Sequence, residues 1–135
     1  MIIGTMPKQV EYALMALLDM QRGHPGKLFS VRELCDRHHV PFDVLSKTMQ
    51  RLVKASILRS VQGVNGGYQI AKDLEAVTLL DLMEAVVGSV AAVNCLKPCG
   101  CARSETCTIS GSMHRLNDQL CAFYAGVAVM GLIEE

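Results

Sequence analysis

The segment from residue 30 to residue 70 constrains the fold most, because it predicts two short helices followed directly by a β-hairpin. Ser30-Val31-Arg32-Glu33 is a capping-box sequence, in which the serine and glutamate side chains satisfy backbone donors at a helix start. We expect that helix to end near His39, and a second helix to run from the turn at Pro41 to about Ser56. Two short helices joined by about four residues are typical of a helix-turn-helix.

The second of these helices has an apolar face and a polar, basic face at helical spacing. In a helix-turn-helix, the second helix enters the major groove of DNA. We therefore expect Ser46, Lys47 and Gln50 to face base edges, and Arg51 and Lys54 to face phosphates.

The hairpin follows at once. Residues 57–62 alternate weakly between apolar and polar, residues 63–67 are rich in glycine and asparagine, and an extended run resumes at Tyr68. We expect the asparagine and glycines to supply positive φ at the turn. A helix-turn-helix followed by a hairpin is a winged helix, in which Arg59 and the tip at Asn65 and Gly66 would approach the minor groove.

The charge distribution supports a nucleic-acid ligand, although the net charge of the chain is zero. Residues 1–72 contain ten lysines and arginines against five acidic residues, whereas residues 73–135 contain three against eight. A basic front half joined to an acidic back half indicates a DNA-contacting module attached to a non-contacting one.

Two further helices are predicted, one before and one after this segment. The first runs from about Pro7 to Met20, with Thr5 as its N-cap. The other begins with a capping-box pattern at Thr78 and closes near Gly88.

The C-terminal region has an apolar residue at alternating spacings of three and four. These residues are Met113, Leu116, Leu120, Phe123, Val127 and Met130. We expect one long helix over about 111–133 that docks against a second copy, giving a homodimer; the alternative is packing within its own subunit. The predicted fold class is mainly α with a small β wing. We expect a winged helix-turn-helix domain over residues 1–77. Residues 78–135 add a short helix, a cysteine-rich loop (about 94–110) and the dimerisation helix.

The sequence also indicates the cellular compartment and the functional class of the protein. The N-terminus lacks the layout of a signal peptide, and the longest apolar stretch has 13 residues, against about 20 for a bilayer span. We expect no membrane association and a cytoplasmic location, where thiols stay reduced. There is no nucleophile–base pattern or phosphate loop, so we do not expect an enzyme.

Four of the six cysteines lie within thirteen positions. Cys95, Cys101 and Cys107 recur every six residues, and Cys99 lies between them. Thiols gathered on a loop of low apolar content oxidise readily if left unpaired, so the pattern favours a soft metal centre.

With these parts assembled, the chain resembles the Rrf-type winged-helix regulators, which include the iron–sulfur cluster regulator and the nitric-oxide-sensing repressor. The matching residues are Tyr12-Ala13-Leu14, Leu52 with Lys54, Gly66-Gly67-Tyr68 with Lys72-Asp73, and the three evenly spaced cysteines. The resemblance implies a homodimer on an inverted-repeat operator in double-stranded DNA, with one iron–sulfur cluster per subunit, either [2Fe–2S] or [4Fe–4S].

The resemblance also implies the cluster ligands Cys95, Cys101 and Cys107, but the fourth differs between branches. One branch uses a histidine three residues after the last cysteine, where this chain has Ser110. The nitric-oxide-sensing branch uses a carboxylate on the partner subunit's first helix, and Glu11 occupies the matching position. Cys99 is the alternative fourth ligand. The cluster-regulator branch also has an arginine where this chain has Gln62, which weakens the expected minor-groove contact.

Two functions from different classes follow. The first is a transcriptional regulator, expected to be a repressor, that senses nitric oxide, redox state or iron–sulfur supply through its cluster. The second is a winged-helix DNA-binding protein whose thiols hold a structural zinc or are redox-active, without a cluster. Zinc loops usually pair cysteines two to four residues apart, which disfavours the second.

Overall fold

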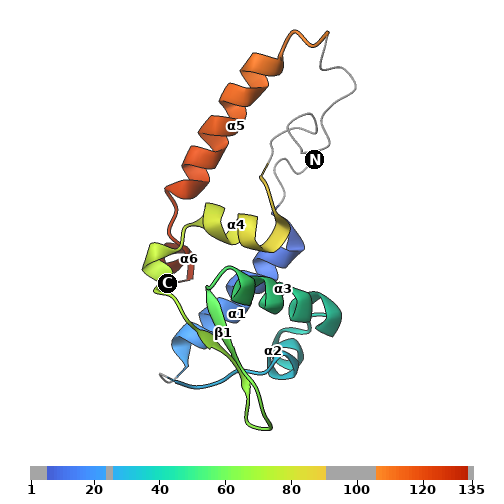
Figure 1. The fold of residues 1–135 in the computed structure, drawn as a ribbon, viewed down its shortest axis with the longest axis vertical. Helices are drawn as coiled ribbons and strands as arrows, with labels where there is room; N and C mark the ends of the chain where they lie inside the picture. Colours follow the sequence, from blue (N-terminus) through green and yellow to red (C-terminus); the bar gives the residue numbers. More distant parts are fainter. Residues whose placement is uncertain (1–5, 24–25, 91–105, 134–135) are drawn as a thin grey trace.

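The computed structural model describes residues 6–23, 26–90 and 106–133 (Figure 1). The elements in chain order are α1 (Lys8–Arg22), α2 (Val31–His38), α3 (Phe42–Lys54), β1 (Leu58–Val61), β2 (Gly67–Ile70), the 3₁₀ helix η1 (Leu74–Ala76), α4 (Leu79–Val87), α5 (Ser110–Ala125) and α6 (Val129–Ile133). The expected fold class, mainly α with a small β wing, is confirmed.

One apolar core joins α1 to α4 with the base of the wing. Its fully buried members include Leu17 of α1, Leu34 of α2, Met49 and Leu52 of α3, and Leu82 of α4. Burial of such side chains supplies most of the favourable free energy of folding. The core therefore holds α3, the helix predicted to enter the major groove (the recognition helix), against both α1 and α4.

The starts of α2 and α4 follow the predicted caps, with one difference. Thr78 and Asp81 form a complete capping box at α4. At α2, the Ser30 hydroxyl accepts the Glu33 backbone N–H at 3.1 Å, but the Glu33 carboxylate pairs with Lys27 Nζ at 3.5 Å. The box at α2 is thus half formed.

The first helix starts one residue later than expected and extends two residues further. Pro7, rather than Thr5, occupies the N-cap position of α1, and it makes no side-chain capping bond. The Thr5 N-cap prediction is therefore wrong. The Pro7 carbonyl accepts the first helical bonds, from the N–H groups of Val10 and Glu11.

The second helix of the pair ends earlier than predicted. α3 stops at Lys54 because Ser56 adopts a positive φ of 65°. The chain then returns to the core, where the buried Ile57 donates its N–H to the Leu52 carbonyl at 3.0 Å.

The wing is an antiparallel two-stranded sheet with Leu58 opposite Ile70 and Val61 opposite Gly67. Positive φ occurs at Gly63 (116°) and Gly67 (153°), so the expectation that Asn65 supplies it is wrong. Gly67 is also required by space, since a Cβ there would lie 2.8 Å from the Phe29 carbonyl oxygen. Two bonds between Phe29 and Tyr68 attach the wing to the segment before α2.

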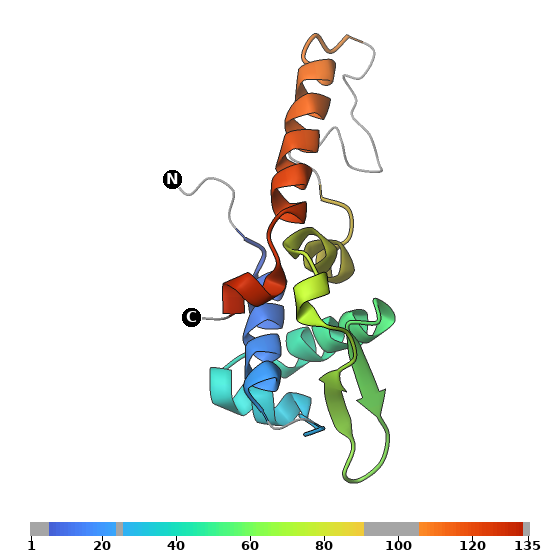
Figure 2. The ribbon, with the colours of Figure 1, turned by 90° about the vertical axis from the view of Figure 1, so that its left-hand side faces the viewer.

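The C-terminal region departs most from expectation. α5 projects away from the other helices (Figures 1 and 2) and ends at Ala125, with Gly126 as its C-cap. The Val127 carbonyl accepts the Leu79 N–H at 2.7 Å, and the Val129 N–H donates to the Val77 carbonyl at 2.9 Å. The predicted single helix over 111–133 is therefore wrong, because α5 ends before these bonds, which attach residues 127 and 129 to the segment around the start of α4.

Met113, Leu116, Leu120 and Phe123 of the predicted apolar seam lie on α5, whereas Val127 and Met130 pack against the core. None of the residues of α5 is buried. No helix within the described ranges is both long and apolar enough to cross a membrane.

Candidate nucleic-acid interface and metal-ligand residues

The polar face of α3 presents a basic surface. Lys47, Gln50, Arg51 and Lys54 are exposed and line a groove of about 250 Å³, while Ser46 is half-buried. The opposite face of α3 is buried, and Thr48 there bonds its own helix through the Val44 carbonyl at 2.9 Å. The five predicted α3 residues are thus brought together on one side of the helix.

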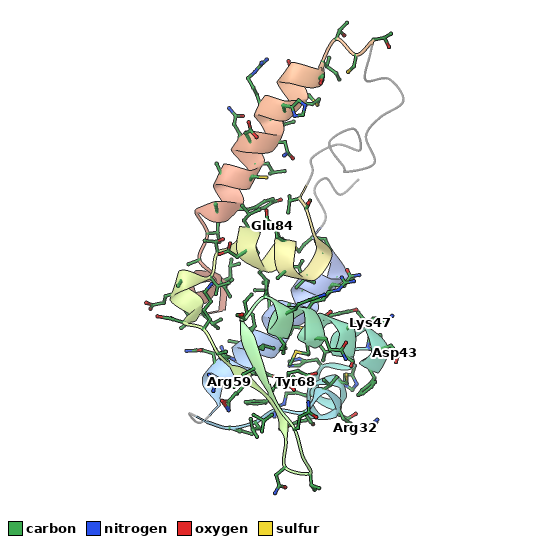
Figure 3. All side chains as sticks on the ribbon, viewed as in Figure 1. Arg32, Asp43, Lys47, Arg59, Tyr68 and Glu84 are labelled. Atoms are coloured by element: carbon green, nitrogen blue, oxygen red, sulfur yellow. The ribbon has the colours of Figure 1, made fainter. Side chains whose placement is uncertain are left out.

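The start of this surface includes residues that sequence reasoning missed. Arg32 of α2 lies over the ring of Phe42, at 5.1 Å from the guanidinium carbon to the ring centroid, and Phe42 is exposed. Figure 3 shows Lys47, Asp43 and Arg32 along the same side of the α2–α3 pair. The sequence could have indicated Arg32, because it is a basic residue in the first turn of the first helix of the predicted helix-turn-helix.

Arg51 has a second role that the sequence did not predict. Its Nη1 donates a hydrogen bond to the Val86 carbonyl oxygen in the last turn of α4. Arg51 also lines a second groove with Lys54, Ala55 and Ala85, between α3 and α4. It therefore connects the recognition helix to α4 while remaining exposed.

Of the predicted wing residues, Arg59 lies near the base of the hairpin, and Asn65 and Gly66 lie at its tip. Arg59 is exposed and its Nη1 donates to Gln69 Oε1, 3.2 Å away on the paired strand. Asn65 is exposed and Gly66 half-buried at the turn, beside a fully exposed Val64. Figure 3 shows Arg59 beside the hairpin, away from Lys47 and Asp43. The wing residues and the α3 residues thus form two separate parts of the candidate interface.

A charged cluster attaches the helix-turn-helix to α1. Asp19 is 12% exposed, with its Oδ2 2.6 Å from His38 Nε2 and 3.4 Å from Arg37 Nη1. A carboxylate so nearly buried requires partners, and both come from the last turn of α2. The cluster holds the C-terminal end of α2 against α1.

Of the predicted cluster ligands, Glu11 and Cys107 lie among the described residues, and Cys95, Cys99 and Cys101 lie outside them. Glu11 is in the first turn of α1; its side chain is 41% exposed and 3.3 Å from Lys8 Nζ. Cys107 is a half-buried free thiol, three residues before α5. No cluster of three metal-ligating side chains occurs within residues 6–23, 26–90 and 106–133.

The two remaining cysteines differ from each other. Cys35 is buried in the core, and this burial raises the pKa of its thiol, with the Asp36 carboxylate acting in the same direction. Cys121 lies half-buried on α5, with its sulfur 3.9 Å from Asn117 Nδ2. Both are free thiols in the structure.

Comparison with known proteins identifies the sequence pattern. The model of the Rrf2 family, described as an iron-dependent transcriptional regulator, matches residues 6–135. The HTH-type transcriptional regulator IscR of Escherichia coli (strain K12 / DH10B) is 26% identical over 122 residues, which are 90% of this chain and 75% of that protein.

Solved structures share the fold. CymR, the global cysteine regulator of B. subtilis, superposes with a TM-score of 0.70 at 16% identity, covering 98% of this chain and 97% of that one. IscR of T. potens superposes with a TM-score of 0.69 at 15% identity, covering 96% and 85%. At these identities the likeness establishes a common fold.

Proposed function

The chain belongs to the Rrf2 family of transcriptional regulators, and we propose that it is a homodimeric repressor that senses through an iron–sulfur cluster held by its cysteines. The signal is nitric oxide, redox state or iron–sulfur supply. Its relatives are transcriptional regulators, so the chain is not an enzyme.

The observation that carries DNA binding is the exposed basic face of α3, set beside a wing. Four side chains on that face are exposed and share one groove, and three of them are positively charged. Phosphate contacts by such cations supply affinity, and the polar side chains among them supply base readout. The DNA-binding residues are Ser46, Lys47, Gln50, Arg51, Lys54, Arg59, Asn65 and Gly66.

The donor atoms available suit an iron–sulfur cluster. Cys107 is a half-buried residue with a free thiol, and a thiolate is the ligand that iron–sulfur clusters take. Glu11 offers a carboxylate whose ion pair with Lys8 is solvent-exposed and therefore weak. Cys95, Cys101 and Cys107 are the proposed thiolate ligands. When bound, the cluster supplies a centre that reacts with oxidants and nitric oxide.

The fourth ligand decides how the subunits are connected. If Glu11 of the partner subunit is the ligand, the cluster joins one subunit's α1 to the other subunit's cysteine segment. A carboxylate binds iron less strongly than a thiolate, so that link would be the first to break. Cys99 as fourth ligand would make the site all-thiolate and leave Glu11 uninvolved.

The exposed side of α5 supports the homodimer. Leu116 is 47% exposed and Phe123 65% exposed, although both are large apolar residues. Exposed apolar patches mark interaction sites, and a second copy of the same helix is the simplest symmetric occupant.

The test is anaerobic purification with visible absorption, iron, acid-labile sulfide and zinc measured per chain. We expect a coloured protein with iron and sulfide in equal amounts. A colourless protein with about one zinc per chain would overturn the cluster and favour a structural zinc site.

Two substitutions identify the fourth ligand. Glu11→Ala should destabilise the cluster if the carboxylate binds it, and Cys99→Ala should do so if the thiolate does. Lys8→Ala is the matched control, since it removes the partner of Glu11 but leaves every proposed ligand. If neither Glu11→Ala nor Cys99→Ala changes the spectrum or its rate of bleaching in air, both assignments are wrong.

A further inference from the structure

The recognition helix and α4 are connected through the hydrogen bond between Arg51 Nη1 and the Val86 carbonyl oxygen. Val86 lies in the last turn of α4, which ends at Val87 with Gly88 as its C-cap. Carbonyls in a last turn lack helical partners and form the negative end of the helix dipole. A guanidinium at this position therefore satisfies a free acceptor and is electrostatically favoured.

This bond leaves most of the Arg51 donors available. A guanidinium has five N–H donors in a rigid planar arrangement, and the bond to Val86 uses one of them. Arg51 is exposed and lines both the groove on α3 and the groove between α3 and α4. Its free edge is therefore open to a ligand while the Val86 carbonyl fixes its orientation.

We infer that Arg51 is a phosphate-binding residue positioned by α4, so that the C-terminal end of α4 sets the DNA affinity of the recognition helix. The inference rests on the proposed function, because it requires DNA to be the ligand of α3. Val86 also precedes Cys95 by nine residues. The end of α4 that orients Arg51 is thus the end from which the chain continues toward the cysteines.

Lys54 provides the matched comparison on the same surface. It lines the same two grooves as Arg51 and is exposed. Among the bonds of the described residues, none joins Lys54 to α4. A change at the end of α4 should therefore act on DNA binding through Arg51 and not through Lys54.

Gly88 allows the end of α4 to be altered without a steric clash. It has φ 91° and ψ −155°, a conformation that residues with a side chain rarely adopt, and a Cβ there would meet no atom within 4 Å. Gly88→Ala should therefore strain the backbone at the end of α4 without adding a steric clash. Gly26, in the connection between α1 and α2, has φ 84° and equally open space. Gly26→Ala is the matched backbone control.

The test is a double-mutant cycle on the full-length protein. Wild type, Arg51→Gln and Lys54→Gln are each prepared with and without Gly88→Ala. Affinity for a fluorescein-labelled mixed-sequence 30-base-pair duplex is measured by anisotropy at several salt concentrations. Arg51→Gln should weaken binding roughly tenfold. It should also make the slope of log affinity against log salt shallower by about 0.9 per protomer.

The coupling is the decisive result. Gly88→Ala should weaken binding about three- to tenfold in wild type and in Lys54→Gln, but leave Arg51→Gln unchanged. Gly26→Ala should leave all three unchanged. If Gly88→Ala does not fold, as judged by circular dichroism, Val87→Gly loosens the same last turn and should show the same dependence on Arg51.

Four outcomes would overturn the inference. One is that Gly88→Ala lowers DNA affinity equally in wild type and in Arg51→Gln. Another is that neither Gly88→Ala nor Val87→Gly changes the DNA affinity of the wild type. A third is an unchanged salt slope in Arg51→Gln. The fourth is an Arg51-dependent gain in affinity, which would mean that the carbonyl withholds the guanidinium from DNA. Absence of DNA binding by the wild type would instead refute the proposed function.

Discussion

Apolar side chains are buried in the helices α1 to α4, whereas α5 leaves apolar side chains of similar size exposed. α1, α2, α3 and α4 each bury at least three residues, and together they form the core. α5, the longest helix described, buries none and leaves Leu116 and Phe123 exposed. The first region is complete within one subunit. The second has an apolar surface that the described part of the subunit does not cover, which is why we assign it to a partner.

The largest difference should appear when a leucine is truncated in each region. Leu52→Ala removes a fully buried side chain of α3 and should lower the free energy of unfolding by about 2–5 kcal/mol. Leu116→Ala, on α5, should change the unfolding of the subunit by about 0.5 kcal/mol or less. Urea unfolding at a protein concentration below the dimer dissociation constant measures both. Equal losses of unfolding free energy in the two variants would contradict this difference between the core and α5.

Truncation of the most exposed aromatic residue of α5 should affect assembly instead of folding. We expect Phe123→Ala to raise the dimer dissociation constant about 30-fold, because central aromatic residues of interfaces contribute about 2 kcal/mol or more. Sedimentation equilibrium measures this constant. Val64→Ala is the control, since Val64 is a fully exposed apolar residue on the wing. A dimer unaffected by Phe123→Ala would place the interface elsewhere.

Charged residues should show the same contrast with smaller magnitudes. Asp19→Asn weakens the bonds from His38 and Arg37 to a nearly buried carboxylate, and should cost about 1–2 kcal/mol of unfolding free energy. Asp118→Asn, at an exposed position on α5, should change it by about 0.5 kcal/mol or less. Thermal unfolding of the two variants side by side distinguishes these values. If Asp19→Asn leaves the free energy of unfolding unchanged, the charged cluster does not hold α2 to α1.

Thiol reactivity gives the smallest and most local comparison. Burial raises the pKa of the Cys35 thiol, so at pH 8 it contains less thiolate than an exposed cysteine. Cys35 should therefore react with iodoacetamide more slowly than the half-buried Cys121, and its rate should keep rising at higher pH. Mass spectrometry of timed samples follows both sites. Faster labelling of Cys35 would contradict its place in the core.

Local sequence signals predicted the DNA-binding region well, because its helices start and stop at residues with strong local preferences. Ser30 and Thr78 cap helices where expected, and Gly88 ends α4. The wing was predicted from its glycines, but which residues take positive φ depends on strand register, and register gave Gly63 and Gly67 this role instead of Asn65.

The sequence-based predictions fail where contacts between residues far apart in the chain determine the structure. The apolar spacing continues through Gly126, so periodicity alone extends the helix to residue 133. The bonds of Leu79 and Val77 to residues 127 and 129 interrupt it, and no local pattern reveals them. The Arg51–Val86 bond, across 35 residues, was missed for the same reason. The roles of Cys95, Cys99 and Cys101 remain predictions from the sequence.

The most direct test of the central claim compares the DNA affinity of one anaerobic preparation before and after exposure to nitric oxide. The duplex is the tightest binder selected from a randomised library, and zinc-loaded protein provides the control. We expect at least a tenfold change in DNA affinity that accompanies loss of the visible absorption. An unchanged affinity after complete loss of that absorption would contradict it, since the cysteines would then have no part in regulating DNA binding.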